Sequence, residues 1–62
     1  MPLTGKDMVK LLKKNGWTKV KQEGSHHKMV KDNKSVVVPV HGNKDLGKGL
    51  EQKILKDAGL KK

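Results

Sequence analysis

The segment Gly24-Ser25-His26-His27 places two imidazole side chains directly after a glycine, in a chain of 62 residues. An imidazole has an ordinary pKa of about 6.5, so it can accept and return a proton near neutral pH. RNA carries its own nucleophile, because a base that removes the 2′-hydroxyl proton lets that oxygen attack the adjacent phosphorus. This cleavage leaves a 2′,3′-cyclic phosphate and a 5′-hydroxyl, and it needs no metal ion or cofactor. One well-placed imidazole of this pair could therefore act as a catalytic base.

Neighbours of the histidines suit the same chemistry. Lys28 follows His26 by two residues in a predicted strand, so both side chains share one face, and the ammonium can stabilise charge on the phosphorane. Ser25 can orient the imidazole or bind a phosphate oxygen, while Gly24 permits a left-handed turn and a close approach of the backbone. His27 is a second candidate for catalytic support. The strand alternation sends His26 and His27 to opposite faces but does not say which faces solvent.

The same residues also fit plainer readings. Histidines in a basic protein often only hydrogen-bond phosphate, or lie on a strand without a chemical role. A single metal ion would have difficulty in collecting two adjacent strand imidazoles. Because the chain has no cysteine and His41 is separate, we do not predict a three-ligand zinc site or any other metal site.

The charge of the chain points to a polyanionic partner. Fifteen lysines and no arginine stand against six acidic residues, which gives a formal net charge of +9. The lysine ammonium is a flexible point charge that suits phosphate groups, whereas specific recognition of guanine favours the two parallel hydrogen bonds of an arginine side chain. We expect salt-sensitive, weakly sequence-specific RNA binding, with Gly24, Lys19, Lys21 and Lys28 at the contact. Two alternatives are an acidic protein that docks on the lysines and a charge that only keeps the chain dispersed.

Turn residues and apolar spacing predict the elements that hold these side chains. Thr4 and Asp7 form a capping box at the start of a helix, which ends at Asn15-Gly16. Strands are predicted over residues 17–22, 25–31 and 35–40, separated by turns at Glu23-Gly24 and Asp32-Asn33. The alternation in the first strand is imperfect, because Trp17 and Val20 have opposite parity. Pro39 indicates that the third strand is an edge or ends there.

A second helix is predicted from a cap at Asp45 to Ala58, with Gly59 as its stop signal. Its expected buried side comprises Leu46, Leu50, Ile54, Leu55 and Ala58. The first helix buries Met8, Leu11 and Leu12. Trp17, the sole aromatic residue, either belongs to the core or stacks on a base, and we favour the core.

These elements predict a single α+β domain over residues 1–62, in the order α-β-β-β-α. Both helices would pack on one face of a three-stranded antiparallel sheet, which is the layout of a double-stranded-RNA-binding domain in miniature. The other face would stay open, with Lys19, Lys21 and Lys28 around it. No apolar run approaches the roughly 20 residues of a membrane span, and residues 1–5 lack a signal-peptide core. We expect a cytoplasmic protein that does not associate with membranes.

Together these features resemble the HicA family, the toxin half of HicAB toxin–antitoxin pairs. The resemblance covers nearly the whole chain, in a fixed order of short segments. These are Lys10-Leu11-Leu12, Asn15-Gly16-Trp17, Gly24-Ser25-His26-His27, Val38-Pro39-Val40-His41, Ile54-Leu55-Lys56 and Ala58-Gly59-Leu60. It implies a ribosome-independent mRNA interferase with a double-stranded-RNA-binding-like fold and a catalytic histidine at His26. A non-catalytic RNA-binding module of the same fold is the alternative.

The resemblance also implies partners. A HicB antitoxin would cover the toxin and hide its active site, mRNA would be the substrate, and operator DNA would be bound only indirectly through the antitoxin. Met29 stands where many relatives have an aromatic residue, and methionine can fill that core space. His41 matches a recurrent family histidine. It either transfers a proton or contacts RNA, or it ties the third strand to the second helix by a side-chain hydrogen bond, which we favour.

Overall fold

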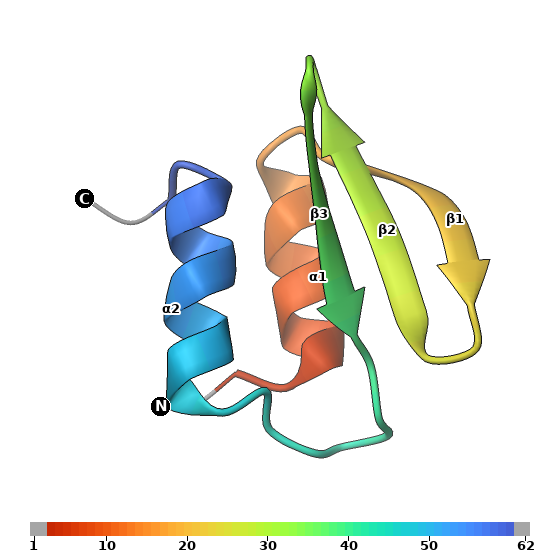
Figure 1. The fold of residues 1–62 in the computed structure, drawn as a ribbon, viewed down its shortest axis with the longest axis vertical. Helices are drawn as coiled ribbons and strands as arrows, with labels where there is room; N and C mark the ends of the chain where they lie inside the picture. The colour runs from red at the N-terminus through yellow and green to blue at the C-terminus, as the bar shows by residue number, and fades with distance from the viewer. Residues whose placement is uncertain (1–2, 61–62) are drawn as a thin grey trace.

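The computed structural model describes residues 3–60, which run helix, three strands, helix along the chain (Figure 1). The elements are α1 (Gly5–Lys14), β1 (Thr18–Glu23), β2 (His26–Lys31), β3 (Lys34–Pro39) and α2 (Lys48–Asp57). The strands form one antiparallel sheet in the order β1-β2-β3. The predicted α+β class and the α-β-β-β-α order are confirmed, and Pro39 ends an edge strand as expected.

Helix α1 begins and ends where its capping residues predict. The Thr4 hydroxyl accepts a hydrogen bond from the Asp7 amide at 3.1 Å, and the Asp7 carboxylate accepts one from the Thr4 amide at 3.3 Å. At the other end Gly16 has a φ of +91°, which a residue with a side chain rarely adopts. The Lys31 ammonium donates to the Asn15 carbonyl at 2.7 Å, where it also opposes the negative end of the helix dipole.

Two-residue turns join the strands. Asp32 and Asn33 connect β2 to β3 as predicted, and Asp32 has a φ of +54°. The first hairpin turn is Gly24-Ser25, one residue later than the predicted Glu23-Gly24, because Glu23 still pairs with His26. Gly24 supplies the positive φ of +58° that this tight turn requires.

Strand β1 contains an irregularity at Val20. Lys19 pairs with Met29 and Lys21 pairs with Lys28, so Val20 is an extra residue between them. Such a β-bulge interrupts the alternation of side chains along a strand. Lys19 and Lys21 therefore lie on opposite faces of the sheet although they are two residues apart.

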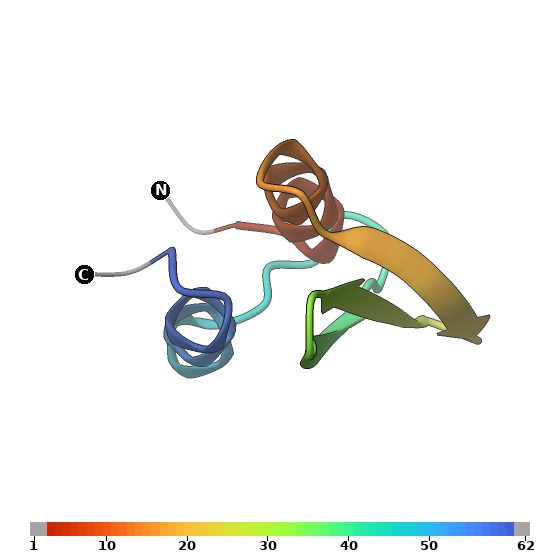
Figure 2. The same ribbon diagram turned by 90° about the horizontal axis from the view of Figure 1, so that it is seen from above.

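The hydrophobic core lies on one face of the sheet, between the strands and the helices. Helix α1 lies behind the sheet in Figure 1, and α2 flanks β3, as Figure 2 shows from above. Both helices contribute to the same cluster of buried side chains: Met8, Val9, Leu12, Trp17, Met29, Val36, Val38 and Ile54. The core positions predicted for Trp17 and Met29 are confirmed, with 3% and 0% of each residue exposed.

The start of α2 differs from its prediction. Asp45 does not cap the helix, because its backbone pairs with Thr4 in an isolated antiparallel bridge. The N-cap is Gly47, with a φ of +89° and no side-chain cap. Leu50 was expected in the core but is 36% exposed, whereas Ile54 is buried. Helix α2 packs mainly against the edge strand β3, which covers only part of its apolar stripe.

The first turn of α1 crosses the end of β3 at close range. A side-chain carbon on Gly5 would collide with the carbonyl oxygen of Pro39 and would lie 2.8 Å from the Cα atom of Val40. Glycine is thus required for this approach. Within residues 3–60 neither helix has the length and apolar composition that crossing a membrane demands.

Candidate active site

The sheet separates the two adjacent histidines. His26 and His27 begin β2, where they pair with Pro39 and Val38 of β3. Val38 is fully buried, so His27 shares the helix-covered face and is half-buried. His26 lies on the open face and is exposed. The structure thus assigns the solvent-facing position, which the alternation alone left undecided, to His26.

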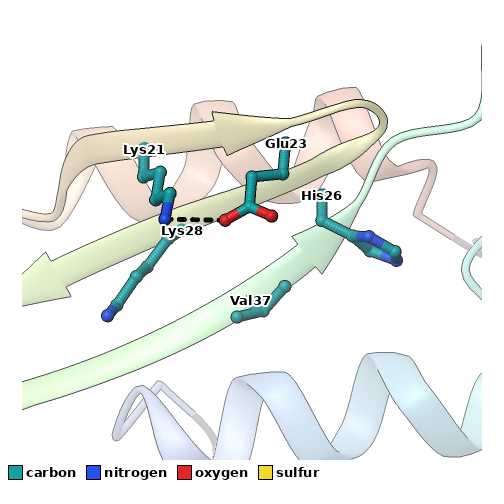
Figure 3. A pocket seen from close by; sticks show the side chains of 5 residues that line it. All are labelled: Lys21, Glu23, His26, Lys28 and Val37. Carbon is teal, nitrogen blue, oxygen red and sulfur yellow. Dashed lines mark ion pairs between the residues drawn. The ribbon is translucent and has the colours of Figure 1, made fainter.

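His26 lies in a shallow hollow on the open face (Figure 3). All three strands line it, with the side chains of Lys21, Glu23, His26, Lys28 and Val37. Its volume of about 340 Å³ is near the lower end of the range for small-ligand sites. The structure therefore places Lys21 and Lys28 around the open face, as the sequence predicted, and adds His26 to the same hollow.

Charges of both signs meet in the hollow. The Lys21 ammonium lies 2.7 Å from the Glu23 carboxylate, and both side chains are mostly exposed. Within residues 3–60, Lys28 forms no salt bridge. An anionic ligand entering the hollow thus meets one ammonium that is already paired and one that is not.

A third histidine approaches His26 from another part of the chain. His41 lies just beyond β3, and its ring is 6.4 Å from that of His26 between centroids, with the planes at 82°. In the part of the chain that the structure describes, the His41 side chain forms no hydrogen bond, so the expected tie to α2 is absent. Sequence reasoning missed this proximity, because the Val38-Pro39-Val40-His41 segment gives no distance between His41 and His26.

The helix-covered face carries the other predicted residues. His27 borders a groove against α1 whose lining includes Lys13, and its buried Nδ1 atom has no hydrogen-bond partner within residues 3–60. Burial lowers the pKa of His27 below 6.5, and the charges of Lys19 and Lys13 lower that pKa further. The expectation that Lys19 lines the open face is wrong, because the bulge at Val20 turns it to the side of His27.

Comparison with known proteins places this architecture in a family. The family model described as the HicA toxin of bacterial toxin–antitoxin matches residues 5–60. This chain belongs to the HicA toxin family. A relative named "Probable mRNA interferase HicA", from Pseudomonas fluorescens (strain Pf0-1), is 49% identical over 39 residues. That alignment covers 63% of this chain and 65% of the relative, which is just under two thirds of the relative's length.

In this HicA-family chain the hairpin turn before His26 is anchored through its backbone. The Ser25 carbonyl accepts a hydrogen bond from the Val40 amide at 2.7 Å. The Ser25 side chain is half-buried and makes no hydrogen bond within residues 3–60. Among residues 3–60 a side-chain carbon at Gly24 would meet no atom within 4 Å, so glycine is favoured here by the positive φ and not by lack of space.

Among residues 3–60 no group of three or more His, Cys, Asp or Glu side chains could hold a metal ion.

Proposed function

We propose that this chain is an endoribonuclease toxin that cleaves mRNA with His26 as general base. One observation carries the proposal: an exposed imidazole and two lysines line the same hollow on the open face of a HicA-family fold. The name of the relative, a probable mRNA interferase, supports the choice of substrate. The net charge of +9 favours the approach of any RNA.

The proposed reaction uses the 2′-hydroxyl of the RNA itself. The neutral imidazole of His26 accepts the 2′-hydroxyl proton while that oxygen bonds to phosphorus, and the bond from phosphorus to the 5′-oxygen breaks. The products are a 2′,3′-cyclic phosphate and a 5′-hydroxyl. A positioned general base contributes about 10²–10⁴-fold to such a rate. Lys28 and Lys21 would stabilise the extra negative charge of the phosphorane.

Ser25 and Gly24 have supporting roles in this proposal. The hydroxyl of Ser25 would bind a phosphate oxygen, and Gly24 would let the RNA backbone come close to the hairpin turn. His27 would not touch the substrate, because it lies on the opposite face of the sheet. This position distinguishes two residues that the sequence alone offered together.

We propose further that a HicB antitoxin inhibits the toxin by covering the open face. Carboxylates of the antitoxin would pair with Lys28 and Lys21 and exclude RNA by competition. Operator DNA would be contacted only through the antitoxin. Reduced binding of the antitoxin to a Lys21→Glu/Lys28→Glu variant, measured by calorimetry, would support this arrangement.

The cleavage test compares His26→Ala with His27→Gln on purified protein. We expect His26→Ala to lose about 10²–10⁴-fold in rate and His27→Gln to keep most of the activity. RNA with a 2′-O-methyl group at the cleaved nucleotide should resist, cleavage should persist in EDTA, and end analysis should find cyclic phosphates. Circular dichroism and Trp17 fluorescence verify folding. RNA that is bound tightly by the wild type but stays intact would instead establish a non-catalytic binding module.

A further inference from the structure

We propose that His41 is a catalytic residue that acts as the general acid and protonates the leaving 5′-oxygen. This inference rests on the proposed ribonuclease function and adds a second proton-transfer group to it. The two imidazoles come from distant segments, since His26 begins β2 and His41 follows β3. The two rings therefore lie close together because of the fold, and not because the residues are close in sequence.

The distance between the rings suits a substrate between two proton-transfer groups. The centroids are 6.4 Å apart and the planes lie at 82°. This separation is too long for a direct hydrogen bond between the rings. It can accommodate one phosphoryl group, with each imidazole within the roughly 2.6–3.2 Å reach that proton transfer requires. Both histidines are exposed, so a ligand can reach them.

The chemistry calls for two groups. As the 2′-oxygen forms its bond to phosphorus, His26 takes up the proton of the 2′-hydroxyl. As the bond from phosphorus to the 5′-oxygen breaks, the electron pair goes to that oxygen, which takes a proton from the His41 imidazolium. The reaction leaves His26 protonated and His41 neutral, and proton exchange with water restores both.

The loop that carries His41 is held at several points. The Val40 amide donates to the Ser25 carbonyl at 2.7 Å, directly between the turn before His26 and the residue before His41. The Lys44 amide donates to the His41 carbonyl at 3.0 Å, which closes a turn. Farther along, the Leu46 amide donates to the Leu3 carbonyl at 2.9 Å. This bracing fixes the backbone on both sides of His41, as a pre-organised acid requires.

Lys28 is the rival for this role, because it lines the hollow with His26. If its ammonium only stabilises the charge of the phosphorane, Lys28 is needed whether or not the leaving group requires a proton. The two roles therefore predict different responses to a change of leaving group.

The experiment uses RNA in which the 5′-oxygen of the mapped cleavage site is replaced by sulfur. A thiolate departs without protonation, so a missing general acid costs little on this substrate. We expect His41→Ala to lose about 10²-fold or more on ordinary RNA and to approach the wild-type rate on the sulfur substrate. His26→Ala should stay slow on both, because the 2′-hydroxyl still needs a base. Asn43→Ala, an exposed substitution in the same loop, is the matched control and should behave as the wild type.

Each other outcome has a defined meaning. Equal loss of rate by His41→Ala on both substrates, in protein shown to be folded by circular dichroism, would overturn the proposal and leave His41 as a positioning residue. Rescue of Lys28→Ala in place of His41→Ala would assign the acid to Lys28 and also overturn it. Failure of the wild type to cleave either substrate would refute the ribonuclease function itself, which separates the two hypotheses.

Discussion

The two faces of the sheet give two neighbouring histidines different exposure and different surroundings. On the open face His26 is exposed beside Lys21 and Lys28. On the helix-covered face His27 is half-buried, and its pKa is lowered by burial and by nearby lysines. The residue types are the same, so the contrast comes from the backbone. The pleat of β2, and not the residue type, thus decides which histidine faces solvent.

The largest expected effect is on the free energy of unfolding, which should fall much more for a substitution on the helix-covered face than for one on the open face. Met29→Ala removes a fully buried side chain and should cost about 2–5 kcal/mol in the free energy of unfolding. Val37→Ala, on a residue 51% exposed on the open face, should cost about 0.5 kcal/mol or less. A domain of this size has only about 3–9 kcal/mol of stability in total. Urea denaturation followed by Trp17 fluorescence measures both, and similar losses would contradict the two-faced arrangement.

The next prediction concerns RNA binding by the two faces. Lys28→Ala should weaken binding to all RNA sequences and reduce the slope of log affinity against log salt by about one. Lys19→Ala should change the slope less, because the bulge turns Lys19 away from the open face. Fluorescence anisotropy with labelled RNA at several salt concentrations provides the measurement. A change of equal size for both variants would mean that RNA wraps around the β1 edge.

A third prediction follows from the lowered pKa of His27. Between that lowered pKa and 6.5, the unfolded chain holds more protons than the folded chain. The free energy of unfolding should therefore fall as the pH drops through 6.5 and level off below the folded-state pKa of His27. His27→Gln should lack this part of the pH dependence. Urea midpoints compared between about pH 7.5 and 5 test it, and parallel curves for the two proteins would refute it.

The smallest expected effect is a change in RNA affinity when the carboxylate of the open face is removed. Glu23→Gln removes the one carboxylate in the hollow and frees Lys21, so RNA should bind a few-fold more tightly. The ion pair is exposed and is worth only about 0.2–1 kcal/mol, which keeps the gain small. Gln22→Glu serves as the control for the other face, because Gln22 pairs with His27 and a carboxylate added there should change the affinity less than one in the hollow. Unchanged affinity for Glu23→Gln would place the RNA phosphates away from Lys21.

Local signals predicted most of this fold. The capping box of Thr4 and Asp7, the glycine stop at Gly16 and the turn at Asp32-Asn33 act over a few residues, so the sequence displays them directly. The bulge at Val20 was less visible, although the opposite parity of Trp17 and Val20 was its trace. Because the prediction did not include this one extra residue, it assigned Lys19 to the wrong face of the sheet.

Tertiary contacts explain what the sequence could not reveal. Asp45 was predicted as a helix cap, but its backbone pairs with Thr4 instead. Leu50 was predicted in the core, but it is exposed because α2 packs on the edge of the sheet. The meeting of His26 and His41 likewise depends on where the loop after β3 runs. Periodicity and motifs do not contain such long-range distances.

The close crossing at Gly5 links a buried residue of α1 to the end of β3 and so to the loop that carries His41. Any bulkier residue there must push the end of β3 away from α1, because the Pro39 carbonyl and the Val40 backbone occupy the space. That displacement would move the loop after β3 and change the distance between the rings of His26 and His41. Gly5→Ala should thus lower the proposed ribonuclease activity, although Gly5 is buried and its added methyl group would not touch the substrate.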